Sequence, residues 1–197
     1  RSVSAFLLNR SSDLRLRTKR RLPALFSYGG SQISPERSAE FYRKYPDCPR
    51  PEPLDRLALP LKREYAEAII AGTKPVEFRE CKPHYGNRIF DKAVMHWRDL
   101  HDADPSITDE DFACADPIRQ VRQIHFYDYN GTWSLDVSVK ETGLIAITDA
   151  DIKMLQDRFA CHDYDEEPAR LSAMGIPDSE RPLLFYFAID KVIYTNL

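Results

Sequence analysis

The chain has 197 residues, of which 43% are hydrophobic and 30% charged, and its formal net charge is −3. This composition is typical of a soluble folded protein with one substantial core, and it argues against a disordered chain. The longest apolar run, Leu183–Ile189, is far shorter than the roughly 20 residues that a membrane helix needs. We therefore expect a cytoplasmic protein with no membrane span.

The first 53 residues are expected to form an N-terminal extension, followed by one domain over residues 54–197. Residues 1–22 carry seven basic side chains and one acid, a net charge of +6, which leaves −9 for the rest of the chain. Such a basic arm can contact phosphates by releasing counterions, or it can simply be a solvated terminus. The extension ends in PDCPRPEP, where four prolines in eight residues exclude a regular helix or central strand. Within it, we expect a helix over Pro35–Lys44 that is capped by Ser34.

A strand, a helix, a turn and a second strand are predicted next. LALPL has the pattern of a short strand, and KREYAEAIIAG has apolar residues at helical spacing. Gly72 follows the last apolar residue, where a left-handed C-terminal cap favours glycine. In the strand VEFRE, Glu77 and Arg79 alternate with two apolar residues and so share one face. Lys74 lies at the start of this strand, so three charged side chains are expected at one edge.

The remainder predicts mostly strands. We expect one strand over Ile89–Trp97, a hairpin that turns at Asn130-Gly131, and a continuation through TGLIAIT. Thr148 is expected to cap a helix that runs to about Phe159, and LLFYFAIDKVIYTN to close the chain as one or two strands. Five or more strands with few helices predict an α+β fold built on a small β-barrel, with a helix after the first strand.

Several common catalytic motifs do not occur. The sequence contains no phosphate-binding P-loop, no G-x-G-x-x-G and no G-x-S-x-G. The four cysteines form no C-x-x-C pair, so no metal site and no cofactor are expected. Cys161, His162 and Asp163 are adjacent, but triad residues meet in space rather than in sequence.

The run LPLKREYAEAIIAGTKPVEFRE resembles the ASCH domain family of the PUA-like superfamily. The matching positions lie on the elements that the family pattern requires, and they are Lys62, Gly72, Lys74, Glu77, Arg79, and after them Tyr85 and Arg88. This resemblance implies a PUA-like β-barrel with a cleft between the first helix and the barrel. Related domains bind RNA or hold one modified base, and some members resemble amidohydrolases acting on N4-acetylcytidine or are described as ribonucleases. The amidohydrolase members use a threonine where this chain has Glu77.

The resemblance and the residue types together predict an RNA- or modified-nucleotide-binding protein. In this reading Glu77 accepts a hydrogen bond from an exocyclic amine, and Tyr85 stacks on a base. Lys74 and Arg79 contact phosphate, and Lys62 and Arg88 are further contacts to the nucleic acid. The alternative is a hydrolase, a ribonuclease or amidohydrolase, in which Glu77 is the general base and Lys74 stabilises the developing anion. A second alternative is a protein-interaction module, in which Glu77 and Arg79 only pair with each other.

Overall fold

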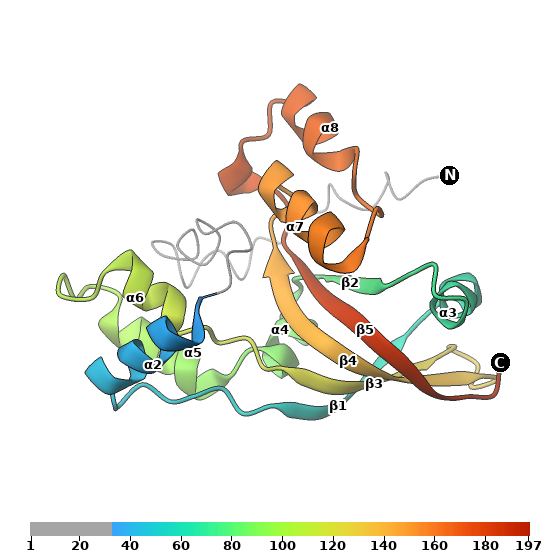
Figure 1. The fold of residues 1–197 in the computed structure, drawn as a ribbon, viewed down its shortest axis with the longest axis horizontal. Coiled ribbons are helices and arrows are strands. Elements are labelled where there is room, and N and C mark those ends of the chain that lie inside the picture. Colours follow the sequence, from blue (N-terminus) through green and yellow to red (C-terminus); the bar gives the residue numbers. More distant parts are fainter. Residues whose placement is uncertain (1–32) are drawn as a thin grey trace.

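The computed structural model describes residues 33–197, and it shows an α+β fold around one curled sheet (Figure 1). The five strands of the sheet are β1 (Leu54–Pro60), β2 (Val76–Glu80), β3 (Val121–Tyr127), β4 (Ser134–Ile145) and β5 (Leu184–Thr195). Their order is β1-β3-β4-β5-β2. The pair β1 and β3 is parallel, and the other three pairs are antiparallel. The sheet curls into a half-barrel with β1 and β2 at its two edges, which agrees with the predicted α+β fold built on a small barrel (Figure 1).

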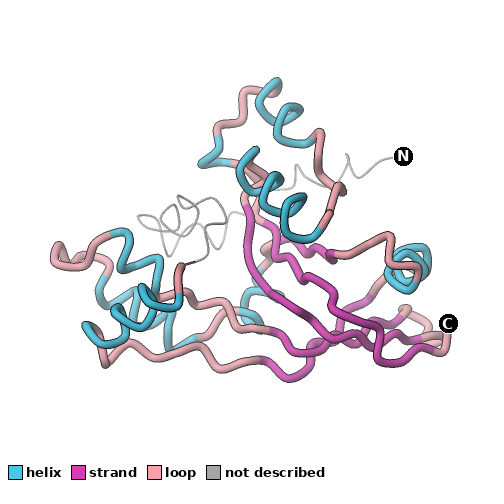
Figure 2. Tube along the Cα trace, viewed as in Figure 1, coloured by secondary structure: helices cyan, strands magenta, loops and turns pink. Residues whose placement is uncertain are grey.

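The helices gather in separate groups around the sheet (Figure 2). They are α2 (Pro35–Lys44), α3 (Arg63–Ile70), α4 (Pro83–Ile89), α5 (Lys92–His101), α6 (Asp109–Cys114), α7 (Asp149–Phe159) and α8 (Glu167–Ala173), with a short 3-10 turn at Asp178–Glu180. Within residues 33–197, no helix is both long and apolar enough to span a bilayer.

The two faces of the sheet carry two apolar cores. On the inner face, Leu57, Phe126 and Phe187 pack against Ala66 of α3 and Ile89 of α4. The opposite core is covered by α7 and α8, and it contains Val76, Phe78, Ile152, Leu155, Leu171 and Tyr186. Since successive residues of a strand point to opposite faces, the even positions of β2, Val76 and Phe78, lie in the core under α7 and α8, and its odd positions face the other way. This division decides where the charged residues of β2 lie.

The predicted helix over Pro35–Lys44 is present, and the Ser34 hydroxyl accepts from the Arg37 backbone amide at its N-terminus. This helix packs against α5 and α6 through a third core that includes Phe41, Trp97 and Phe112. Residues 33–53 are thus joined to later parts of the chain by buried apolar contacts. The basic run over 1–22 lies outside the described residues, and the boundary at residue 53 stays a prediction.

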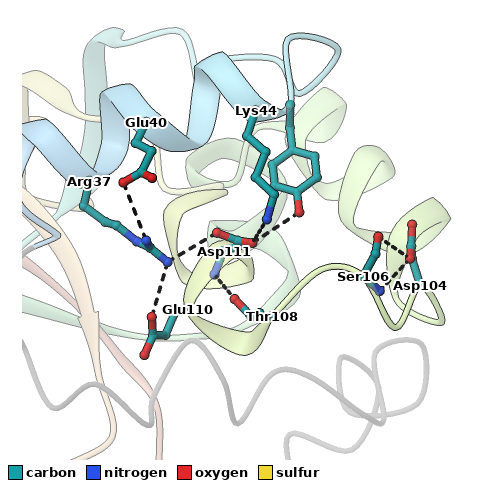
Figure 3. A network of polar contacts seen from close by, with 9 residues as sticks. Arg37, Glu40, Lys44, Asp104, Ser106, Thr108, Glu110 and Asp111 are labelled. Carbon is teal, nitrogen blue, oxygen red and sulfur yellow. Dashed lines mark hydrogen bonds and ion pairs between the residues drawn. The ribbon is translucent and has the colours of Figure 1, made fainter.

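A buried carboxylate reinforces the contact between α2 and α6 (Figure 3). Asp111, which is 5% exposed, accepts from Lys44 Nζ at 2.8 Å and from the Tyr45 hydroxyl at 3.2 Å, and Arg37 lies at 3.3 Å. Burial acts to raise the pKa of Asp111, but these hydrogen bonds and the two cations outweigh it and hold the pKa below its ordinary value. The group is therefore a structural ion cluster that fixes the extension on α6.

The predicted strand over Ile89–Trp97 is wrong, because most of this segment is helix α5. The Asp91 carboxylate caps the helix by accepting from the amides of Ala93 and Val94, at 2.9 and 3.2 Å. Val94 and Trp97 are buried three residues apart, which is a helical spacing. The other expected elements are confirmed. The β3–β4 hairpin turns with Gly131 at a φ of +68°, α7 begins at its Thr148 cap, and β5 is one long strand.

Candidate functional site

The turn between α3 and β2 places Lys74 at the edge of the sheet. Gly72 adopts a φ of +74°, a conformation that disfavours residues with a Cβ. The amides of Thr73 and Lys74 then both donate to the Ala68 carbonyl, at 2.9 and 3.1 Å, which ties the turn to the end of α3. Lys74 consequently lies at the end of the turn, two residues before β2 begins at Val76.

Strand alternation buries Glu77 and Arg79 on the inner face of the sheet. Val76 and Phe78 belong to the core under α7 and α8. Glu77 and Arg79 are paired in register with Phe187 and Phe185 of β5, two residues of the inner core. Glu77 is only 3% exposed, so its carboxylate lies inside the protein and must be compensated by nearby donors or cations.

Arg79 provides that compensation and also links the two sheet edges. Its Nη1 donates to Glu77 Oε1 and, at 2.8 Å, to the Phe78 carbonyl. Its Nη2 donates to the Pro60 carbonyl at the end of β1, at 2.6 Å. Burial lowers the pKa of Arg79 from its ordinary value, while the nearby Tyr85 phenol acts in the opposite direction. The guanidinium therefore joins β2 to β1 where no strand pairing joins them among the described residues.

Lys74 lies between two carboxylates. Its Nζ is 2.5 Å from Asp163 Oδ2 and 3.7 Å from Glu77 Oε2, and it stands 5.4 Å from the centre of the Tyr65 ring. Asp163 comes from the loop between α7 and α8, far from Lys74 in sequence. From the sequence alone, Asp163 belongs only to the adjacent Cys-His-Asp run over residues 161–163 and is not assigned to this site, since only the packing of the loop beside β2 brings it to Lys74.

Glu77 keeps one oxygen that can accept a further hydrogen bond. Within residues 33–197, the contact of Oε2 is with Lys74 at 3.7 Å, which exceeds a hydrogen-bond distance. An ionised carboxylate offers about four lone-pair sites, and the contact with Arg79 uses the other oxygen. The site thus holds a nearly buried acceptor, with a side chain 4% exposed, beside an ammonium group, and this pair matches a ligand with a donor next to an acceptor.

The remaining predicted residues lie around this group at different distances. Tyr85 is half-buried on α4, packs against the inner core and has its ring 3.8 Å from that of His84. Lys62 is exposed and lies 3.5 Å from Glu64. Arg88 donates to the Ala58 carbonyl at 3.2 Å. In the described part of the chain, neither Lys62 nor Arg88 contacts Lys74, Glu77 or Arg79, and the ligand-binding roles of these residues stay predictions.

The phosphate-binding roles predicted for Arg79 and Lys74 also stay predictions. Both terminal nitrogens of Arg79 donate to protein acceptors here, and Lys74 Nζ donates to Asp163. Residues 33–197 contain no group of three or more histidine, cysteine or acidic side chains arranged to hold a metal ion. Hydrogen-bonding and charged groups at the site are supplied by Lys74, Glu77 and Asp163, with the Tyr65 ring nearby.

Comparison with known proteins gives a distant similarity to a solved structure. No protein-family model matches the chain, and no curated protein matches it. Among solved structures, it is similar to the crystal structure of a serine-to-alanine mutant of the ZmASCH protein from Zymomonas mobilis, with 14% identity and a TM-score of 0.35 over 70% of this chain and 68% of that one.

Proposed function

We propose that the chain binds a nucleobase, as part of RNA or of a modified nucleotide, at the edge formed by Lys74 and Glu77. The observation that carries this proposal is the Glu77 carboxylate, which is held in one position by Arg79 while its Oε2 remains without a hydrogen bond in the described residues. A carboxylate is the natural partner of an exocyclic amine such as N4 of cytosine. The adjacent Lys74 ammonium can donate to a base carbonyl.

Aromatic side chains near this edge support binding of a planar group. Tyr65 lies beside Lys74, and Tyr85 is close enough to Arg79 to influence its pKa. Tyr65 is 37% exposed, so part of its ring surface is accessible to a base. Stacking of a base on an aromatic ring contributes roughly 1–3 kcal/mol. The combination of a fixed acceptor, a donor and aromatic surface favours a base over a purely anionic ligand.

The hydrolase alternative requires Glu77 to take up a proton from water or from a ribose hydroxyl. Two cationic side chains lie beside this carboxylate, and Arg79 Nη1 already donates to its Oε1. The arrangement is suited to accepting a hydrogen bond more than to removing a proton. Liquid chromatography with mass detection, applied to RNA and N4-acetylcytidine after incubation with the protein, would reveal a cleaved product if catalysis takes place.

The proposal is tested by measuring binding of cytidine by calorimetry to the wild type and to Glu77→Gln. We expect the variant to bind at least about tenfold more weakly, since one amide oxygen replaces a charged acceptor. Glu64→Gln is the matched control, because Glu64 is an exposed glutamate that also pairs with a lysine. Equal binding by Glu77→Gln and the wild type, with both variants folded by thermal unfolding, would exclude the proposed site.

A further inference from the structure

The loop between α7 and α8 places Asp163 in a fixed position beside Lys74. On one side of it, Cys161 is 2% exposed and lies in the core under α7 and α8. On the other side, the Tyr164 ring packs edge-to-face on Phe78 of β2, with ring centres 4.9 Å apart. Because Cys161 and Tyr164 are both packed into the protein, the backbone that carries Asp163 is held in place, and its carboxylate belongs to the site.

The two carboxylates cancel the positive charge of the site. Lys74 and Arg79 supply two cations, and Glu77 and Asp163 supply two anions that contact them. The side chain of Asp163 is 36% exposed, against 12% for Lys74. Asp163 is therefore the outer member of its pair, and a ligand that approaches Lys74 from solvent meets a negative charge first.

A phosphate group beside Lys74 would have to displace Asp163 or lie next to it. Both outcomes are unfavourable, because the Asp163 contact is short and charge-assisted and because like charges at close range repel strongly where water is partly excluded. A neutral carbonyl or hydroxyl oxygen suffers no such repulsion. The Lys74 ammonium has three N–H donors, so it can bind that oxygen while it keeps Asp163.

We propose that Asp163 is a specificity-determining residue, which rejects ligands that bring a phosphate to Lys74 and favours those that bring a neutral oxygen. This inference rests on the proposed function, and it narrows the ligand to a base or nucleoside unit whose phosphates, if any, point away from Lys74. In RNA, the bound unit would then be a base turned into the site with its backbone outside.

The test compares cytidine with inorganic phosphate, which can place an anionic oxygen at Lys74, by calorimetry at neutral pH and low salt. We expect the wild type to bind cytidine more tightly, and Asp163→Asn to reduce the preference about tenfold by improving binding of phosphate, since a like-charge contact is removed. Asp165→Asn is the matched control. Asp165 lies in the same loop with a 37% exposed side chain, and its partners are Gln156 and His162.

The outcomes separate this inference from the proposed function. Cytidine binding with an unchanged preference in Asp163→Asn would overturn the role of Asp163 and leave the base-binding proposal standing. The same change in Asp163→Asn and Asp165→Asn would also overturn it, because the effect would then come from the net charge of the loop. If the wild type bound neither compound, both proposals would fail together.

Discussion

Replacement of Arg79 by methionine should destabilise the fold strongly, because it leaves a buried carboxylate without its direct partner. Glu77 has a side chain that is 4% exposed, and Arg79 is 14% exposed, so solvent screens the pair poorly. Without the guanidinium, the nearest cation to Glu77 is Lys74 at 3.7 Å, and the carbonyls of Pro60 and Phe78 lose a donor. Breaking a buried ion pair in this way costs about 3–5 kcal/mol.

Urea unfolding followed by tryptophan fluorescence provides the assay, since Trp97 and Trp133 are both buried. Adding Glu77→Gln to Arg79→Met should recover part of the loss, because the unpaired charge is then removed as well. The control is Arg63→Met, which breaks an exposed pair with Glu67 and should change the free energy of unfolding by about 0.5 kcal/mol or less. A loss below about 1 kcal/mol in Arg79→Met, or no recovery in the double variant, would refute the buried pair.

Two further predictions concern Gly143 and Asp116, which are both partly exposed. Gly143→Ala should lower the free energy of unfolding in urea by about 1–3 kcal/mol, because a Cβ there would overlap the Tyr186 ring, whose hydroxyl donates to Glu141. A stability equal to that of Ser138→Ala, on the same strand, would contradict this. Burial raises the pKa of Asp116 from 3.8 to about 6, so the folded state favours the protonated carboxyl. The stability that this group contributes is therefore present below about pH 4 and is lost as the pH rises through about 6. The wild type should therefore lose roughly 1–2 kcal/mol relative to Asp116→Asn across this range, and a constant difference would contradict it.

Local signals in the sequence predicted much of the fold. The Ser34 and Thr148 caps, the glycine at 72 and the Asn130-Gly131 turn are each determined by a few neighbouring residues, and the structure has all four. Strand period also placed Glu77 and Arg79 on one face of β2. These features depend on backbone geometry and side-chain alternation, which a short window of sequence contains.

The errors and omissions come from long-range packing. The β-branched and aromatic residues between Ile89 and Trp97 favour a strand locally, but the Asp91 cap and the core shared with α2 stabilise a helix. The contacts of Arg79 with Pro60 and of Lys74 with Asp163 join residues that are 19 and 89 positions apart. Neither contact follows from spacing or composition, because each depends on how the sheet curls and where the α7–α8 loop packs.

The central claim is that a base binds at the edge formed by Lys74 and Glu77, and the most direct test is an NMR titration of isotopically labelled protein with cytidine. We predict that the largest changes in backbone amide shifts occur over residues 74–79 and at Asp163, and that Glu77→Gln removes them. Changes confined to α2, α5 and α6, or no changes at a large excess of cytidine, would contradict the claim.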